Sequence, residues 1–343
     1  MADYFKYIEQ LSGRLESAKN IVIICHVNPD GDAVGSQLAL YHFLLSKGKK
    51  ASMISPNNLQ DFLTWMDGVE EICIYTRNRK DCNEMIASAD LVIMVDFNQS
   101  NRLGEAENAV LKSKAYKVII DHHLDPGSFT DLMISDTSRC STSELIHILV
   151  TGINKGHFVN RSYAEVIYVG IITDTGNFEH GSFTGETFRI IADLLDAGID
   201  RERIYNLVFN NFSADRMKLK GLSLNERMVV LPELHTAYIV LSKSDLENYN
   251  YRKGDTEGFV NMPLSISGIR FSALLMEKKD HIKLSFRSKG TFPVNEFAQK
   301  YFSGGGHRNA SGGEYRDTLD NTVSFFLAAL DKESGSLRAS EQK

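Results

Sequence analysis

Short apolar runs alternate with segments of helical periodicity through the first half of the chain. Residues 20–25 (NIVIIC) form a continuous β-branched run, as in a strand covered on both faces. Residues 36–48 (SQLALYHFLLSKG) have helical spacing and end at Gly48. Further strands are predicted at 50–54, 71–75, 90–97 and 117–123, with helices at 83–89 and 105–113. This alternation predicts an α/β fold in which a mostly parallel sheet has helices on both faces.

The second half has a different pattern. Residues 141–224 are mainly helical, whereas 227–233, 236–242, 269–278 and 281–289 are strand-like. A helix at 294–301, a glycine-rich loop at 303–313, a short strand and a helix at 320–332 follow. We therefore predict a first domain at 1–212, a connector at 213–225, a smaller α/β domain at 226–332 and a disordered polar tail at 333–343.

Composition excludes several classes of protein. A net charge of −6 over 343 residues argues against sequence-blind binding of long nucleic acid, which depends on many cation–phosphate contacts. No basic, apolar leader opens the sequence and no apolar run approaches the ~20 residues that span a bilayer. The four cysteines form no CxxC pair and are expected to be reduced thiols. We expect a cytoplasmic protein without a membrane segment; a homodimer stays open.

Acidic and imidazole residues follow several predicted elements. In an open α/β sheet, side chains beyond the carboxyl ends of the strands converge even when they are distant in sequence. Asp174 ends an apolar helical run, where an isolated buried carboxylate would be costly. The residues expected to converge are His26, Asp30, Asp32, Asp96, Asp121, His122, His123 and Asp174.

Charge counting favours metal ions in this cluster. Four aspartates in one cleft repel one another, and two divalent cations would balance them. Carboxylate and imidazole ligands without thiolates favour Mn²⁺, with Mg²⁺ or Co²⁺ as alternatives. A pair of such ions is a common device for phosphoryl displacement.

Four segments resemble the motifs of the DHH phosphoesterase superfamily: HVNPDGDAVGS, VDFN, DHH and GIITDTGNF. SGGGHRNASGG (303–313) resembles the motif of its DHHA1-type C-terminal domain. The resemblance covers nearly the whole chain and is closest to the bacterial nanoRNase and pAp phosphatase group. It makes 1–212 a DHH catalytic domain and 226–332 a DHHA1 substrate-binding domain.

The resemblance implies specific metal ligands. One ion would be held by His26, Asp30 and Asp96. The other would be held by Asp32, Asp96, His122 and Asp174, so Asp96 would be a ligand of both ions. Asp121 would orient the ring of the ligand histidine, and His123 would assist the leaving oxygen.

The implied activity is hydrolysis of very short oligoribonucleotides (nanoRNA) to mononucleotides and of pAp to AMP. The implied mechanism is attack on phosphorus by a hydroxide activated by two metals. The partners are thus short oligoribonucleotides or small nucleotides.

Candidate substrate contacts lie in both domains. Arg102 keeps the Arg-x-Gly end of the second motif and is expected to contact phosphate. Arg287, on the polar face of residues 281–289, is expected to hold a terminal phosphate or stack on a base. The glycine-rich loop is expected to approach an anion through its main-chain amides, with contacts from Gly304, Gly305, Gly306, His307 and Arg308.

Several weaker expectations accompany these. Ser141 and Thr142 precede a predicted helix, so one hydroxyl should cap it, and one is a candidate partner for the DHH histidines. Asn177 and His180 are placed in the cleft because they follow Asp174.

Three alternatives stay open. A cyclic or linear dinucleotide phosphodiesterase would use the same catalytic and DHHA1 parts. A DHH-type inorganic pyrophosphatase would have another kind of C-terminal domain. A non-catalytic nucleotide-binding module would have little reason to keep all six expected metal ligands.

Overall fold

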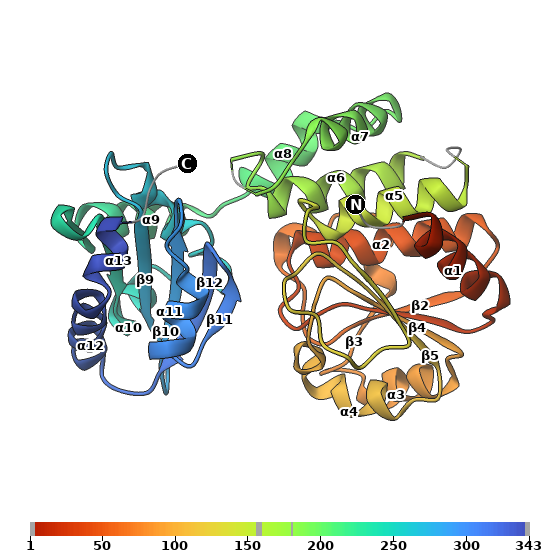
Figure 1. Cartoon of the computed structure of the whole chain (residues 1–343), viewed down its shortest axis with the longest axis horizontal. Helices are drawn as coiled ribbons and strands as arrows, with labels where there is room; N and C mark the ends of the chain where they lie inside the picture. The colour runs from red at the N-terminus through yellow and green to blue at the C-terminus, as the bar shows by residue number, and fades with distance from the viewer. Residues whose placement is uncertain (1–3, 156–159, 180, 340–343) are drawn as a thin grey trace. The chain divides into compact units, whose positions relative to one another are not determined.

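The computed structural model describes residues 4–155, 160–179 and 181–339. The chain divides into two compact units between Asn211 and Phe212 (Figure 1). His180 and residues 340–343 of the expected tail lie outside the described residues. Among the described residues, no helix combines the length and the apolar character that crossing a membrane requires.

The first unit contains a six-stranded parallel sheet in the order β3-β2-β1-β4-β5-β6. Its strands are β1 (Ile21–Ile24), β2 (Ala51–Ser55), β3 (Ile72–Ile74), β4 (Leu91–Val95), β5 (Tyr116–Asp121) and β6 (Leu132–Ser135). The predicted α/β class with a mostly parallel sheet is confirmed. The short edge strand β6 has no counterpart in the sequence prediction.

Helices cover both faces of this sheet. Alternate residues of a strand point to opposite faces, so Ile23 of β1 packs with one layer of helices and Ile24 with the other. One layer contains α3 (Arg79–Ser88) and α4 (Glu107–Lys112); the other contains α1 (Tyr4–Ser17), α2 (Gly31–Ser46), α5 (Thr142–Ile153) and α6 (Arg161–Asp174) (Figure 1). The remaining elements of this unit are α7 (Gly185–Asp196), α8 (Arg201–Phe209), η1 (Asp61–Leu63), η2 (Val69–Glu71) and η3 (Ser100–Ala106).

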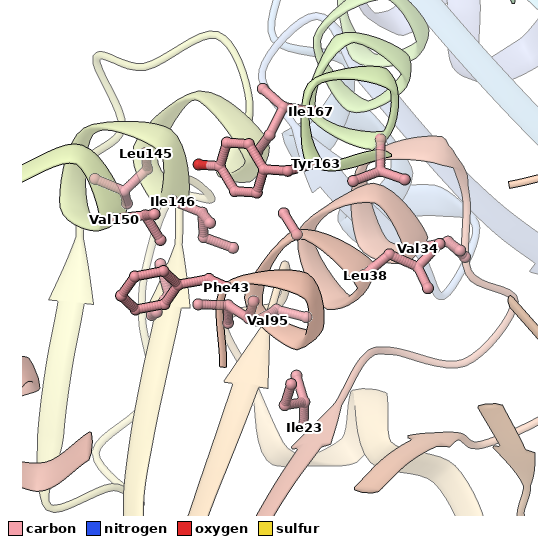
Figure 2. Close-up of a cluster of buried hydrophobic side chains, with 14 of the residues drawn as sticks. Ile23, Val34, Leu38, Phe43, Val95, Leu145, Ile146, Val150, Tyr163 and Ile167 are labelled. Carbon is pink, nitrogen blue, oxygen red and sulfur yellow. The ribbon is translucent and has the colours of Figure 1, made fainter. Parts of the chain in front are cut away.

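Helix α2 lies at the centre of the unit, between the sheet and the helices α5 and α6. Leu38 and Phe43 of α2 pack against Ile23 from the sheet, while Ile146 and Tyr163 come from the outer helices (Figure 2). Each such side chain contributes roughly 1.5–3 kcal/mol when it is fully buried. Gly35 permits the close approach of α6, because a Cβ there would lie 2.5 Å from the Val166 carbonyl oxygen. The start of α2, which carries Asp32, is therefore held by the core.

The second unit contains a mixed sheet in the order β11-β12-β10-β9-β8-β7. Its strands are β7 (Met228–Leu231), β8 (Thr236–Leu241), β9 (Phe271–Glu277), β10 (Ile282–Ser288), β11 (Gly305–His307) and β12 (Ala310–Tyr315); only β8 and β9 pair in parallel. An aromatic core packs one face of the sheet against the helices α11 (Val294–Tyr301), α12 (Leu319–Lys332) and α13 (Ser334–Ala339). On the other face lie α9 (Ala214–Asn225), α10 (Lys243–Asn248) and η5 (Phe259–Ser265), while η4 (Pro232–Leu234) links β7 to β8.

Two segments differ from their predicted form. Residues 213–225, predicted as a connector, contain helix α9, whose Leu219 is fully buried in the second unit. Residues 334–339, predicted as disordered, form α13, whose Leu337 is also fully buried. The helical pattern of residues 213–224 was predicted, but it does not show that the helix packs in the second unit. The few apolar residues of 334–339 give too weak a periodic signal to predict α13.

Candidate metal centre

The loop after β1 supplies three of the expected ligands. His26 directly follows the strand region and is only 3% exposed. Asp30 is the N-cap of α2, because its Oδ1 accepts hydrogen bonds from the main-chain N–H groups of Asp32 (3.1 Å) and Ala33 (3.0 Å). Its Oδ2 lies 3.9 Å from His26 Nε2. The start of the helix thus holds Asp30 beside His26 and places Asp32 in the first turn.

Asp96 lies between two histidines. It follows β4, is 2% exposed, and has its Oδ2 3.4 Å from His26 Nε2. Its Oδ1 lies 3.8 Å from His122 Nε2. The backbone φ of Asp96 is 66°, in the left-handed region that residues other than glycine seldom adopt. Such strain concentrates at functional sites, and here it accompanies a carboxylate that faces both rings.

The other expected ligands gather around His122, which follows β5. Asp174 is the last residue of α6, and its Oδ2 lies 3.3 Å from His122 Nε2. Asp32 Oδ2 lies 4.0 Å from the same nitrogen. One ligand atom each from Asp32, His122 and Asp174 lies within 4.8 Å of the others, and the same is true of His26, Asp30 and Asp96. The structure therefore brings all six expected ligand side chains together.

Main-chain carbonyl groups lie beside the rings of both histidines that are candidate ligands. His26 Nδ1 lies 2.8 Å from the Val27 carbonyl oxygen, and His122 Nδ1 lies 3.2 Å from the Arg139 carbonyl oxygen. Because a carbonyl oxygen can only accept, the Nδ1 atoms donate to these carbonyls, and the Nε2 atoms then carry the lone pairs and face carboxylates. This is the orientation of a metal-ligating imidazole held from its far side. In the His26 ring, this tautomer makes the 3.2 Å approach of Arg102 Nη2 to Nδ1 a contact between two donors rather than a hydrogen bond.

The first turn of α5 contacts two of the carboxylates. Ser141 caps the helix, because its hydroxyl accepts from the main-chain N–H of Glu144. The main-chain N–H groups of Thr142 and Ser143 donate to the two oxygens of Asp32 at 2.6 Å and 2.8 Å. The Thr142 hydroxyl donates to Asp96 Oδ1 at 2.8 Å, and so binds an aspartate rather than a DHH histidine.

Arg102 lies beside His26 at the edge of the cluster. Its Nη2 is 3.2 Å from His26 Nδ1, and its carbonyl oxygen accepts from the main-chain N–H of Val27. Gly104, with φ 57°, packs where a Cβ would lie 2.5 Å from Val27 Cγ1. The Arg-x-Gly sequence thus brings a guanidinium to the cluster through a turn that requires glycine.

The glycine-rich segment of the second unit is a β-hairpin rather than a free loop. β11 pairs with β12, and a Cβ at Gly304 would lie 2.0 Å from the Gly312 carbonyl oxygen. Gly306 has φ 141°, and a Cβ there would lie 2.7 Å from the Ala310 carbonyl oxygen. These two glycines therefore have a reason in local packing, whereas Gly305 has only a distant side-chain neighbour. Arg308 Nη2 donates to the Thr291 carbonyl oxygen at 3.2 Å.

Arg287 shares a face of the second sheet with this hairpin. Residues paired directly across antiparallel strands point to the same face. Arg287 pairs with Ala310, and Ala310 pairs with His307. The neighbouring row contains Ser285, Gly312 and Gly305. The small residues Ser285, Gly312 and Gly305 thus lie on the same sheet face as Arg287 and His307.

Comparison with known proteins identifies the family of the chain. Residues 20–171 match the DHH family, N-terminal domain, and residues 234–334 match the DHHA1 domain. A Bacillus subtilis protein named bifunctional oligoribonuclease and PAP phosphatase NrnA is 31% identical over 293 residues, which cover 85% of this chain and 88% of the relative. The chain belongs to the DHH family.

Solved structures agree with this assignment. The crystal structure of an exopolyphosphatase-related protein from Bacteroides fragilis is 42% identical, with a TM-score of 0.94 over 97% of this chain and 98% of that one. RecJ from Thermus thermophilus, solved in complex with Mn²⁺, is 14% identical, with a TM-score of 0.60 over 96% of this chain and 55% of that one. At that identity the likeness shows a shared fold.

The charges of the candidate ligand side chains in the first unit are suited to binding divalent cations. Burial and then the neighbouring Asp32 carboxylate raise the pKa of Asp96 well above its usual range. The same two causes, in the same order, raise the pKa of Asp174. Burial lowers the pKa of His26, which favours the neutral ring that ligates a metal. In such a cluster, repulsion between the carboxylates disfavours their ionisation. Divalent cations bound by the carboxylates and neutral imidazoles would compensate this repulsion.

Asp121 differs from the expectation, because it orients the other histidine. Its Oδ1 accepts from His123 Nδ1 at 2.7 Å, whereas the expected ligand His122 is held by the Arg139 carbonyl. Asp121 is fully buried, and successive side chains at a strand end point to opposite sides. Its carboxylate therefore reaches the residue two positions on, rather than the adjacent His122.

Proposed function

We propose that this chain hydrolyses very short oligoribonucleotides to mononucleotides and pAp to AMP, using two divalent cations. The observation that carries the proposal is the cluster of six side chains in which Asp96 faces both His26 and His122. The B. subtilis relative named for both activities supports the choice of substrates.

The cations are proposed to be Mn²⁺, with one held by His26, Asp30 and Asp96. The second would be held by Asp32, Asp96, His122 and Asp174. Mixed carboxylate and imidazole ligands support this choice. When bound, two such ions lower the pKa of water and stabilise the charge on attacking and leaving oxygens.

The protein's own residues orient the ligands and move a proton. Asp96 is held by the Thr142 hydroxyl, and Asp32 by two amides at the start of α5. His123 donates from Nδ1 to Asp121, so Nε2 of the neutral ring carries a lone pair; after this nitrogen takes up a proton from solvent, it can donate that proton to the leaving oxygen. The Asp121 carboxylate stabilises the protonated ring, as in other histidine–aspartate pairs.

The second unit is proposed to bind the substrate's phosphates and bases. Support comes from the shared face of Arg287 and His307, because arginine binds phosphate with two parallel hydrogen bonds. Arg102 is proposed to contact the reacting phosphate from its position beside His26. We also propose a cytoplasmic location, supported by four cysteines that are free thiols.

A substrate panel tests the proposal. The purified chain with Mn²⁺ is incubated with dinucleotides to pentanucleotides, pAp, cyclic dinucleotides and pyrophosphate. We expect turnover of the shortest RNAs and of pAp. Asp96→Ala should reduce it by more than about 1000-fold, since both cations lose a ligand. Asp61→Ala, which changes an exposed carboxylate in η1, is the matched control and should retain activity.

Two outcomes would contradict the assignment. Hydrolysis of pyrophosphate or of cyclic dinucleotides alone would place the chain in another substrate class. Full activity of Asp96→Ala would remove the shared carboxylate from the mechanism.

A further inference from the structure

Arg139 contributes to the candidate metal centre through its main chain and to a polar network through its side chain. Its carbonyl oxygen accepts the hydrogen bond from His122 Nδ1 at 3.2 Å. The same residue extends its guanidinium away from the cluster, with only 13% of the side chain exposed. The position of the carbonyl therefore depends on whatever holds the rest of the residue.

Three separate parts of the unit hold the guanidinium. Its Nε donates to the Tyr4 hydroxyl in α1 at 2.8 Å, and its Nη1 donates to Glu186 Oε2 in α7 at 2.6 Å. Nη1 also lies 3.8 Å from Glu144 Oε1 in α5, a carboxylate that is 1% exposed. A buried carboxylate is costly without an opposite charge, so this pairing opposes displacement of Arg139.

The turn that contains Arg139 is fixed at both ends. The main-chain N–H of Asp136 donates to the Asp121 carbonyl oxygen, which continues the pairing of β5 with β6. The Asp136 side chain accepts from Ser138 and from the Tyr4 hydroxyl. At the other end, the main-chain N–H of Cys140 donates to Glu144 Oε2. Tyr4 thus connects both to this turn and to the guanidinium that anchors it.

We propose that Arg139 is a positioning residue for His122. Anchored by Tyr4, Glu144 and Glu186, it holds the carbonyl that keeps the proton on Nδ1 and directs Nε2 toward Asp174 and Asp32. As far as it concerns metal, the inference rests on the proposed function. The tautomer of the His122 ring can be measured without any metal.

Two measurements on Arg139→Gln test the inference. Nitrogen-15 NMR of the metal-free protein reports which ring nitrogen of His122 carries the proton, and Mn²⁺ calorimetry reports the two affinities. His26→Ala and His122→Ala assign each affinity to a group of ligands. We expect Arg139→Gln to lose the preference for the Nδ1 proton. We also expect it to weaken the group containing His122 by roughly 10–100-fold, with the other group changed less than about twofold.

Companion variants separate positioning from folding. Arg139→Lys keeps the charge but not the planar fork, so it should recover part of the affinity. Tyr4→Phe keeps the aromatic contact, removes the link to Asp136, and should shift the same affinity in the same direction; it carries the test if Arg139→Gln does not fold. Arg161→Gln is the matched control, because Arg161 pairs with Glu165 at a side chain that is 59% exposed.

Wild-type tautomer and affinities in a folded Arg139→Gln would overturn the inference, as would equal weakening of both ligand groups. A wild-type protein that binds no divalent cation would instead refute the proposed function. The tautomer measurement would still decide the role of Arg139.

Discussion

The hydroxyl of Thr142 donates a hydrogen bond to Oδ1 of Asp96 over 2.8 Å. This hydrogen bond places the first turn of α5 against the carboxylate that faces both candidate ligand histidines, His26 and His122. Thr142→Val keeps the shape of the side chain and removes this donor. We expect Mn²⁺ affinity, measured by calorimetry, to fall by roughly 10–100-fold, as for other residues that orient metal ligands. Thr151→Val is the control, since Thr151 donates within α5 to the His147 carbonyl; equal losses in both variants would refute a specific role for Thr142.

Asp174→Asn should stabilise the metal-free protein and abolish stabilisation by metal. The pKa of Asp174 is raised in the folded state by burial and by Asp32, so the unfolded state loses its proton first. The free energy of unfolding in EDTA should therefore fall as pH rises above about 4, the unfolded pKa of aspartate. The Asn variant should lack this contribution. Denaturant titrations at several pH values, with and without Mn²⁺, measure both effects, and a wild-type response of the variant to Mn²⁺ would contradict the ligand assignment.

Gly170→Ala should damage both packing and the metal centre. A Cβ at Gly170 in α6 would lie 1.9 Å from Ser143 Oγ and 2.8 Å from Asp32 Oδ1. Overpacking of this kind costs about 1–3 kcal/mol, and displacement of Asp32 should also reduce Mn²⁺ affinity. Gly13→Ala in α1, where nothing lies within 4 Å, should instead stabilise the protein by about 0.5–1 kcal/mol. Thermal unfolding of the two variants should therefore shift in opposite directions.

Arg287→Ala should separate substrate binding from chemistry. Arg287 lies on the same face of the second sheet as His307, at a distance in sequence from the metal ligands. Its loss should raise KM for pAp by about 10-fold or more, since a charged hydrogen bond contributes about 1.5–3 kcal/mol, while kcat changes little. Arg316→Ala changes an exposed arginine after β12 and serves as the control. A fall in kcat at unchanged KM would exclude Arg287 from substrate binding.

The sequence predicted the central strands of the first sheet well, because β1 and β4 are continuous apolar runs rich in β-branched residues. Those strands also predicted the convergence of His26, Asp96 and His122, since parallel strands end at one edge. The hydrophobic pattern could not predict β6 or α13, because these elements have few apolar residues and are stabilised mainly by tertiary contacts. Prediction was weakest where a short segment has two structural options, as in the glycine-rich residues that pair as β11 and β12.

The proximity of the six candidate ligand side chains could be predicted from the sequence, whereas the groups that hold them could not. Aspartate and histidine side chains have chemical identities that a sequence displays. By contrast, the carbonyl oxygens of Val27 and Arg139 orient the rings, and every residue has a carbonyl. The main-chain N–H groups at the start of α5 are equally impossible to single out from the sequence, because almost every residue has one. The choice of Asp121 as the partner of His122 failed for the same reason, because the actual partner is a main-chain atom.

The strands that directly precede three of the candidate ligands, β1, β4 and β5, are all interior strands of their sheet. Each of these strands is hydrogen-bonded on two sides, so His26, Asp96 and His122 cannot shift along the strand direction unless the hydrogen bonds to both neighbouring strands break. A sheet in which one of these strands is misaligned would therefore be unstable and would unfold, rather than persist as a folded but inactive protein. The relative positions of these three side chains thus depend on the cooperative folding of the whole sheet.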